Sequence, residues 1–284
     1  MNQRSASAPE YRGVYINLAR STDRDQLLRA NLKEAGLDKI YSRYEAVDGS
    51  VVAYAHQTTL KAGELGSWLS VQGILESQQS AQYDLHILED DLEFCRGFAK
   101  KFGAVQRQLD TIRDSWDIVY TDLLFPPDHD TYRHLFSMIK AYAARGDLSL
   151  LQLSNHVFAA ISSVLINRQS IHKCLDFVRS GWNEGLPIDL YFKLLVRRGK
   201  LKAFVTVPFL TSTSDISVKS EIRGDLDRSR QVGELLRCAC FVDADIPKLE
   251  QRLQDLVEGS TNTRLDFLYS QAVRFTLSDQ YERY

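Results

Sequence analysis

The residues best suited to chemistry are three consecutive carboxylates, Glu89, Asp90 and Asp91, which directly follow the apolar segment LHIL (85–88). Adjacent anions repel one another unless they are solvated or share a cation. Mg²⁺ and Mn²⁺ prefer carboxylate oxygens, and they often bind through one or two of them together with substrate phosphates. The triplet therefore indicates either a solvated acidic turn or a site for a metal–diphosphate, and both interpretations remain open at this point.

The backbone at this triplet limits how many of its side chains can share one ion. Successive side chains of an extended segment point to opposite sides. Glu89 and Asp91 would then face one side and Asp90 the other, so three ligands to a single ion would require a bend.

The pattern of apolar residues predicts the fold that must position these carboxylates. Apolar or β-prone segments lie at 13–19, 40–47, 84–88, 116–122, 156–166 and 200–209, and helical patterns at 22–35, 63–81, 96–113, 168–180 and 187–198. Their alternation predicts an α/β fold with a mostly parallel sheet flanked by helices. Ligands bind such sheets at the carboxyl ends of the strands, where the triplet lies.

Composition shifts divide the chain into three parts. Residues 1–11 are expected to form a loose tail, residues 12–215 the α/β domain, and residues 216–284 a helical appendage packed on it. Within the domain, Pro, Asp and His residues from Leu123 to about His134 indicate a loop. In the appendage, Arg237 and other arginines are interspersed with acidic residues, which is typical of a solvated helix.

Overall charge and cysteine content exclude several classes of protein. The 284 residues include 35 basic and 37 acidic side chains, a formal net charge of −2, which argues against general binding to nucleic acid. The four cysteines lack zinc-site spacing and the N-terminus lacks the apolar core of a signal peptide, so we expect a cytoplasmic protein. Peripheral contact with the inner face of a membrane remains open, and the sequence does not indicate an oligomeric state.

Four segments, in order and at similar spacing, resemble the signatures of glycosyltransferase family 25, the lipopolysaccharide and collagen galactosyltransferase group. They are VYINLARSTDRDQLL (14–28), YEAVDGS (44–50), GELGSWLS (63–70) and LHILEDD (85–91). The resemblance covers residues 12–95 well and residues up to 215 weakly. It implies a GT-A type fold, a nucleotide-sugar donor such as a UDP-hexose, a divalent metal (Mn²⁺ or Mg²⁺) and inversion at the anomeric carbon.

The resemblance also implies roles for particular residues. Asp91 would hold the metal ion. The donor would be bound by residues from all four segments, namely Asn17, Arg20, Arg24, Asp48, Glu64, Ser70, Glu89 and Asp90.

The residues themselves leave alternatives open for several of these roles. Arg20 and Arg24 lie near a helix N-terminus, which suits phosphate, but Arg24 could equally be a solvated helix residue. Asp48 could form an Asx turn, and Glu64 could be a carboxylate at the start of a helix.

An inverting transferase needs a base for the acceptor hydroxyl. Asp189, in a segment that resembles the family's later Pro-Val-Asp, is the candidate for catalytic base or acceptor anchor. Its alternative role is a carboxylate in the first turn of a helix. Asp215 is a lower-ranked candidate for base or second metal contact.

These observations lead to one main hypothesis and two rivals. The main one is a metal-dependent inverting transferase that moves a hexose, galactose or glucose, from a UDP-sugar to a hydroxyl of a glycan or lipid-linked glycan, such as lipopolysaccharide or surface polysaccharide. Ser67 and Val71 stand where the family usually has Cys and His. Val71 in place of the usual His motivates the first rival, a catalytically silent nucleotide-sugar-binding or scaffolding relative. The second is a metal-dependent phosphohydrolase using the same carboxylates.

Overall fold

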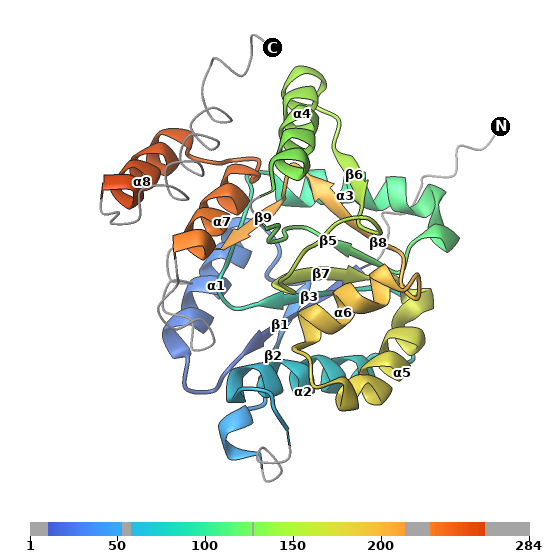
Figure 1. Ribbon diagram of the computed structural model, residues 1–284. Coiled ribbons are helices and arrows are strands. Elements are labelled where there is room, and N and C mark those ends of the chain that lie inside the picture. Colours follow the sequence, from blue (N-terminus) through green and yellow to red (C-terminus); the bar gives the residue numbers. More distant parts are fainter. Residues whose placement is uncertain (1–10, 53–57, 127, 214–227, 259–284) are drawn as a thin grey trace, which may run out of the picture.

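The computed structural model describes residues 11–52, 58–126, 128–213 and 228–258. Its centre is a seven-stranded sheet in the order β2-β1-β3-β7-β5-β8-β6 (Figure 1). The strands are β1 (Tyr11–Asn17), β2 (Tyr41–Glu45), β3 (Asp84–Glu89), β5 (Ile118–Tyr120), β6 (Ser149–Gln152), β7 (Ser163–Ile166) and β8 (Ala203–Val207). A small second sheet pairs β4 (Leu92–Phe94) with β9 (Thr211–Thr213).

Five strands of the large sheet share one direction. Strand β1 is parallel to β2 and β3, and β5 is parallel to β8. Strand β7 lies antiparallel between β3 and β5, and β6 is antiparallel to β8 at the edge. The α/β fold with a mostly parallel sheet flanked by helices, expected from the sequence, is therefore confirmed.

Helices cover both faces of the sheet. They are α1 (Thr22–Glu34), α2 (Ala62–Ser77), α3 (Phe98–Thr111), α4 (His129–Arg145), α5 (Ile171–Gly181), α6 (Ile188–Arg197), α7 (Arg228–Ala239) and α8 (Ile246–Glu258). Short 3₁₀ helices lie at Gly49–Val51, Arg113–Ser115, Arg168–Ser170 and Trp182–Glu184. Helices α2, α5 and α6 pack on one face, and α1 and α3 pack on the other.

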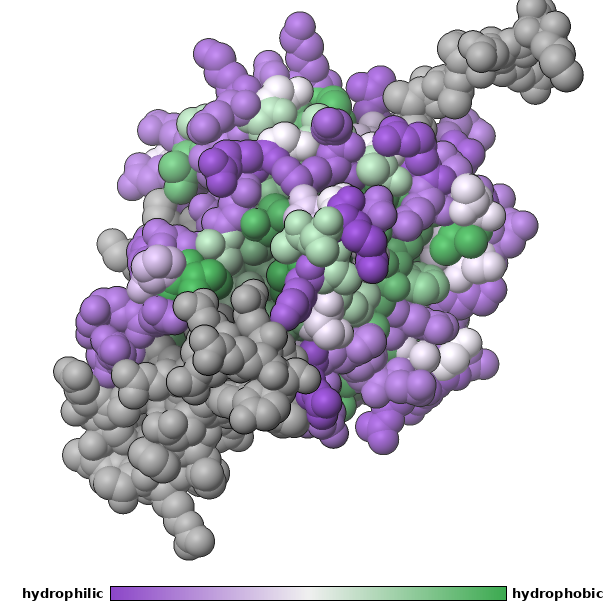
Figure 2. Space-filling model, turned by 90° about the horizontal axis from the view of Figure 1, so that it is seen from above, coloured by the Kyte–Doolittle hydropathy of each residue, from purple (hydrophilic) through white to green (hydrophobic). Residues whose placement is uncertain are grey.

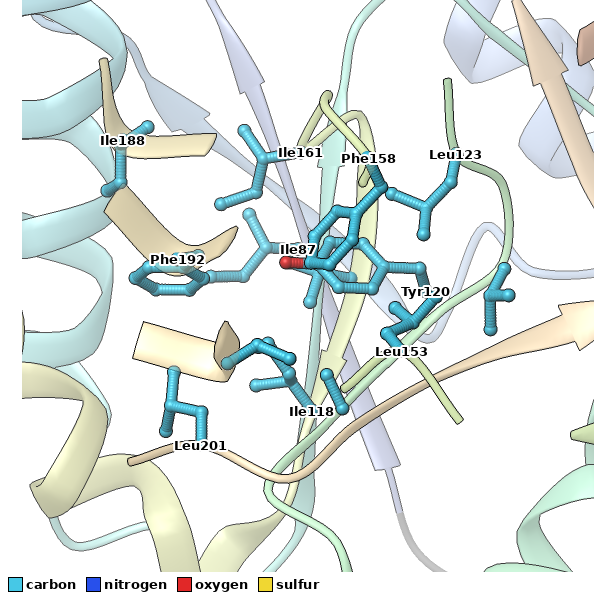
Figure 3. Close-up of a cluster of buried hydrophobic side chains, with 14 of the residues drawn as sticks. Ile87, Ile118, Tyr120, Leu123, Leu153, Phe158, Ile161, Ile188, Phe192 and Leu201 are labelled. Atoms are coloured by element: carbon cyan, nitrogen blue, oxygen red, sulfur yellow. The ribbon is translucent and has the colours of Figure 1, made fainter. Parts of the chain in front are cut away.

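Alternating side chains of the strands build two hydrophobic clusters, one on each face. In β5, for example, Ile118 and Tyr120 join the cluster beneath α2, α5 and α6, whereas Val119 joins the cluster beneath α1 and α3. Figure 3 shows part of the first cluster, in which the rings of Tyr120 and Phe158 lie side by side, with their centroids 5.7 Å apart. Burial of these side chains fixes the register of the sheet.

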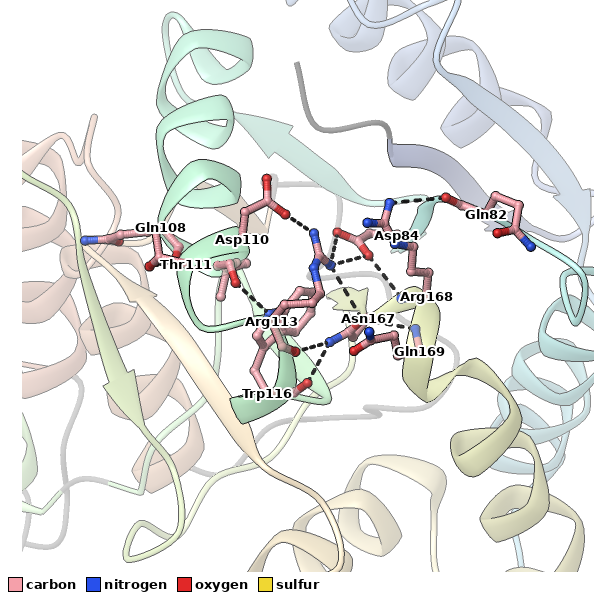
Figure 4. A network of polar contacts seen from close by, with 11 residues as sticks. Gln82, Asp84, Gln108, Asp110, Thr111, Arg113, Trp116, Asn167, Arg168 and Gln169 are labelled. Carbon is pink, nitrogen blue, oxygen red and sulfur yellow. Dashed lines mark hydrogen bonds and ion pairs between the residues drawn. The ribbon is translucent and has the colours of Figure 1, made fainter. Parts of the chain in front are cut away.

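A polar network closes the sheet at the end where β3 begins (Figure 4). Arg113 Nη1 lies 2.7 Å from both carboxylate oxygens of Asp84, and Asn167 Nδ2 donates to the carbonyl oxygens of Arg113 and Trp116. Asp84 also accepts from the backbone N–H of Arg168 at 3.0 Å. These contacts join β3, α3 and β7 at the edge opposite the acidic triplet.

The sequence predicted a loop at 123–134, but the second half of this segment is helical. Helix α4 begins at His129, and Asp128 Oδ2 accepts from Thr131 N at 2.8 Å, which is a helix N-cap. The residues that suggested a loop therefore include a capping residue.

Two helices, α7 and α8, form the described part of the expected appendage. Val232, Leu235 and Leu236 of α7 are buried in the cluster beneath α2, α5 and α6. The expected boundary at 215–216, residues 1–10 of the expected tail, and residues 216–227 and 259–284 of the expected appendage fall outside the described residues. Tyr11, the last residue of the expected tail, instead begins β1.

Viewed from above, the surface mixes polar residues with apolar residues that gather toward the middle of this face (Figure 2). Among the described residues, no helix is both long enough and apolar enough to cross a bilayer.

Candidate functional site

A cavity of about 610 Å³ lies where β1, β2 and β3 end. The strand register explains its position, because Asn17 pairs with Glu45 and Ile16 with Glu89. The three segments that follow these parallel strands therefore meet at one edge of the sheet, as expected for a ligand site. Seven of the residues proposed from the sequence line this cavity, namely Arg20, Arg24, Asp48, Ser70, Glu89, Asp90 and Asp91.

The acidic triplet bends, so its side chains do not alternate as they would in an extended segment. Strand β3 ends at Glu89 and the chain turns at Asp90 and Asp91. Both aspartates consequently reach one guanidinium: Arg24 Nη1 lies 2.7 Å from Asp90 Oδ1, and Arg24 Nη2 lies 3.2 Å from Asp91 Oδ2. Asp90 is 7% exposed and Asp91 is 5% exposed. The solvated acidic turn is thus excluded for these two residues.

Burial makes the charged form of the Asp90 carboxyl group energetically unfavourable. Desolvation raises the pKa of Asp90 above its ordinary value, although the Arg24 charge and the hydrogen bond from Asn17 act in the opposite direction. A further positive charge near this carboxylate would offset the cost of its burial.

Asn17 is 1% exposed and is not among the residues that line the cavity. Its Nδ2 donates to Asp90 Oδ2 at 2.7 Å and to the Ser21 carbonyl oxygen at 3.0 Å, and its Oδ1 accepts from Arg43 Nε at 2.9 Å. Asn17 therefore joins the end of β1, the start of α1 and the acidic turn into one unit.

Asp48 both forms an Asx turn and lines the cavity. Its Oδ1 accepts from Ser50 N at 3.0 Å and from Ser50 Oγ at 2.6 Å, and these bonds lower the pKa of Asp48. Its Oδ2 pairs with the Arg20 guanidinium across the cavity edge.

Ser70 and two glycines hold the Asp48 loop against α2. Ser70 Oγ accepts from Val47 N at 2.9 Å and donates to the Gly66 carbonyl oxygen at 2.7 Å. A Cβ on Gly66 would lie 2.5 Å from the Val47 carbonyl oxygen, and one on Gly49 would lie 1.9 Å from that of Ala62. The glycines thus permit a backbone–backbone approach.

Glu64 does not line the cavity. Its Oε2 accepts from Lys61 N at 2.9 Å, so it caps the start of α2. Val71 is also turned away from the cavity, because it is 1% exposed and lies in the hydrophobic cluster beneath α2. The departure from the family pattern at Val71 therefore removes no side chain from the cavity wall.

Asp189 lies at the same edge of the sheet but is not among the residues lining this cavity. Its Oδ2 accepts from Ala160 N at 3.0 Å, and Ala160 has a φ of +82°. Two residues later, the Ser162 carbonyl oxygen accepts from Glu89 N at 2.8 Å. Asp189 is thus connected through one short segment to the acidic turn. Asp215 lies outside the described residues.

The sequence failed to identify a buried ion pair beside this edge. Arg237 of α7, expected to be solvated, is 1% exposed, and its Nε lies 3.0 Å from Asp122 Oδ2. Ser162 Oγ donates to Asp122 Oδ1 at 2.7 Å, and Arg237 Nη2 donates to Ser162 Oγ at 2.5 Å. The sequence signal for this pair was Asp122, the last residue of the β-prone segment 116–122.

The residues present fit a divalent cation that is shared with a bound ligand. Among the described residues, Asp91 Oδ1 is buried and has no hydrogen-bond partner. Five carboxylates and two arginines line the cavity, a formal excess of three negative charges. Within the same part of the chain, no group of three or more His, Cys, Asp or Glu side chains could hold a metal by itself. A cation here would need ligand oxygens from elsewhere, as Mg²⁺ commonly does from phosphates.

No protein-family model and no curated protein matches the sequence. Among solved structures, the fold is weakly similar to mouse xyloside xylosyltransferase 1 in its apo form. The TM-score is 0.35 and the identity 14%, over 69% of this chain and 72% of that chain. These comparisons do not confirm the resemblance to family 25, which remains a prediction.

Proposed function

We propose that the chain is a metal-dependent inverting glycosyltransferase. Its donor would be a UDP-hexose, carrying galactose or glucose, and its acceptor a hydroxyl of a glycan or lipid-linked glycan such as lipopolysaccharide or surface polysaccharide.

One observation carries this proposal: residues from all four glycosyltransferase-like segments line a single cavity. Arg20, Asp48, Ser70 and Asp91 come from parts of the chain far apart in sequence, yet each lines it. The parallel strands bring these segments together, and the cavity between them is lined by side chains that the resemblance assigns to donor and metal binding.

The cavity wall offers groups of both charges to a metal–diphosphate. The N-terminus of α1, at Thr22, lines the cavity and favours anions, and Arg20 and Arg24 add positive charge. Asp91, helped by Asp90 or Glu89, would hold Mn²⁺ or Mg²⁺, which would neutralise charge on the leaving diphosphate.

The transfer itself requires a base. The acceptor oxygen would attack the anomeric carbon as the bond to the diphosphate oxygen breaks, and the hydroxyl proton would pass to a carboxylate. Asp189 remains the proposed base or acceptor anchor, supported by its place at the edge of the sheet where the cavity opens.

A second candidate is a catalytically silent relative that binds a nucleotide sugar or acts as a scaffold. The position of Asp189 favours it, because this carboxylate accepts a backbone hydrogen bond and lies outside the residues lining the cavity. Binding of donor without any transferred sugar would support this candidate.

A direct assay tests the proposed reaction. The full chain is incubated with UDP-galactose or UDP-glucose, Mn²⁺ and a panel of truncated lipopolysaccharide acceptors, and products are identified by mass spectrometry. We expect a mass gain of one hexose with wild type and none with Asp91→Asn. Asp176→Asn, an exposed carboxylate on α5, is the matched control and should behave as wild type. Undiminished turnover by Asp91→Asn would refute the metal assignment.

A further inference from the structure

Arg24 occupies the position of a counter-ion for the acidic turn. Its guanidinium bridges Asp90 and Asp91, with nitrogen–oxygen distances of 2.7 and 3.2 Å. The two carboxylate side chains are only 9% and 7% exposed, so little water reaches them, and the arginine supplies much of their compensation.

We propose that Arg24 competes with the divalent cation for Asp90 and Asp91, and that it yields this position only when a diphosphate is present to receive its guanidinium. The inference rests on the proposed function. It adds that metal and donor each strengthen the binding of the other, and that metal alone binds weakly. The chemical class of ligand that releases Arg24 is a nucleoside diphosphate or its sugar ester.

The two positive groups exclude each other for a simple electrostatic reason. A cation bonded to the oxygens of Asp90 and Asp91 would stand within a few ångströms of a guanidinium bonded to the same carboxylates. Like charges at that separation in a partly dry site repel strongly. One of the two must therefore leave, and the longer, partly solvated arginine side chain is the one that can move.

The surroundings allow Arg24 to move without disturbing the carboxylates. The Arg24 side chain is 25% exposed, it comes from the first turn of α1, and it lines the cavity that would receive the diphosphate. Asp90 keeps a second anchor, the 2.7 Å hydrogen bond from Asn17. Asp91 Oδ1 already lacks a partner among the described residues, so one coordination position requires no displacement.

Thermodynamic linkage makes the competition measurable. If the diphosphate draws Arg24 away, it raises metal affinity, and metal must raise diphosphate affinity by the same factor. Couplings of this kind are typically about 5–150-fold. Removing the guanidinium should reduce the coupling by the part that displacement of Arg24 contributes, because metal alone then meets two uncompensated carboxylates. The part that comes from direct bonds between metal and phosphate should remain.

The test measures Mn²⁺ affinity of the full chain by electron paramagnetic resonance of free Mn²⁺, with and without saturating UDP. In wild type, UDP should tighten Mn²⁺ binding by about tenfold or more. In Arg24→Gln, Mn²⁺ without UDP should bind about tenfold more tightly than to wild type, and UDP should tighten Mn²⁺ binding by a smaller factor than in wild type. The control is Arg29→Gln, five residues further along α1, whose partner is Asp25 at 2.9 Å; it should match wild type.

Arg24→Lys provides a second variant in case loss of the charge prevents folding. Lysine keeps one positive charge but cannot bridge two carboxylates with a planar fork, so its Mn²⁺ affinity without UDP should lie between those of wild type and Arg24→Gln. If neither variant binds Mn²⁺ alone more tightly than wild type does, while wild type still binds Mn²⁺ with UDP, the competition is refuted and the proposed function stands. If no protein binds Mn²⁺ with or without UDP, metal dependence fails and the competition fails with it.

Discussion

Asn17 and Asp90 are 73 residues apart in sequence, yet Asn17 Nδ2 donates a 2.7 Å hydrogen bond to Asp90 Oδ2 in the interior of the protein. This bond joins the ends of two neighbouring parallel strands. The resemblance assigned both residues to donor binding, whereas the geometry gives Asn17 a second task, which is to hold the acidic turn in place.

Replacing Asn17 should therefore damage both the fold and the site. Asn17→Ala removes hydrogen bonds to Asp90, Ser21 and Arg43 and leaves buried partners unsatisfied. We expect the free energy of unfolding to fall by about 2–3 kcal/mol, as measured by urea denaturation. Asn31→Ala, which removes one bond to the Leu92 carbonyl oxygen, should cost less, about 1 kcal/mol. Equal losses in the two variants would contradict the special role of Asn17.

The close approach of the Asp48 loop to α2 predicts a strong effect of one added methyl group. In Gly66→Ala, the new Cβ would lie 2.5 Å from a backbone oxygen, so the loop must shift. We expect a loss of about 1–3 kcal/mol in stability and weaker binding of UDP.

Gly103→Ala in α3 is the matched control. Its Cβ would meet nothing nearer than Arg107 Nη1 at 3.6 Å, so alanine should stabilise the helix by up to about 1 kcal/mol. Thermal unfolding and calorimetric titration with UDP measure both effects. Tolerance of Gly66→Ala comparable to that of Gly103→Ala would show that the loop packs differently.

The buried pair of Arg237 and Asp122 predicts a non-additive double-mutant cycle. Arg237→Met leaves the Asp122 carboxylate, 0% exposed, without its cation and should cost about 3–5 kcal/mol. Adding Asp122→Asn removes the unpaired charge, so the double variant should recover part of that stability. Urea denaturation of all four proteins gives the coupling energy. A value near zero would mean that the pair does not link α7 to the edge of the sheet.

Asp117 predicts how stability depends on pH. Burial alone would raise the pKa of Asp117, but bonds from Lys173, the Lys202 backbone N–H and Ser170 outweigh it and lower the pKa. A carboxyl group with a lowered folded pKa stabilises the protein above its unfolded pKa, and this stabilisation is lost as pH falls through the folded value. Asp117→Asn should therefore lose stability at pH 7 and show a weaker decline toward acid than wild type.

Denaturation at pH 7 and at a series of pH values below 4.5 measures this dependence. Asp176→Asn, which alters an exposed carboxylate, should leave the decline unchanged. The interpretation fails if Asp117→Asn and wild type lose stability in parallel as the pH is lowered.

Local patterns were sufficient to predict the elements that carry the acidic turn. The apolar run at 84–88 became β3, and the helical pattern at 63–81 became α2, Ala62–Ser77. The first is a short apolar run, buried on both faces, with an acidic boundary. The second is a longer apolar stretch in which the buried Leu65, Trp68 and Leu75 recur at helical spacing. The grouping of Arg20, Asp48 and Asp91 was also expected, because parallel strands place their carboxyl ends at one edge of the sheet.

Long-range contacts decided what the sequence could not show. Arg237 lies among acidic neighbours, a pattern typical of a solvated helix, but α7 turns it toward Asp122, 115 residues away. Glu64 and Ser70 matched a binding motif. In the structure, the hydrogen bond of Glu64 caps the start of α2, and that of Ser70 holds the Asp48 loop against α2. No periodicity in one segment reveals which distant backbone atom a side chain will meet.

The proposed role of the acidic turn is to bind a cation together with a nucleotide diphosphate. The most direct measurement is a thermal-shift series of the full chain with UDP, UDP-galactose and UDP-glucose, each with and without Mn²⁺. We predict that one UDP-sugar with Mn²⁺ raises the Tm by about 5 °C or more, and that either component alone has a much smaller effect. The same rise with the nucleotide sugar in the absence of any divalent metal, or no rise with any combination, would contradict the account.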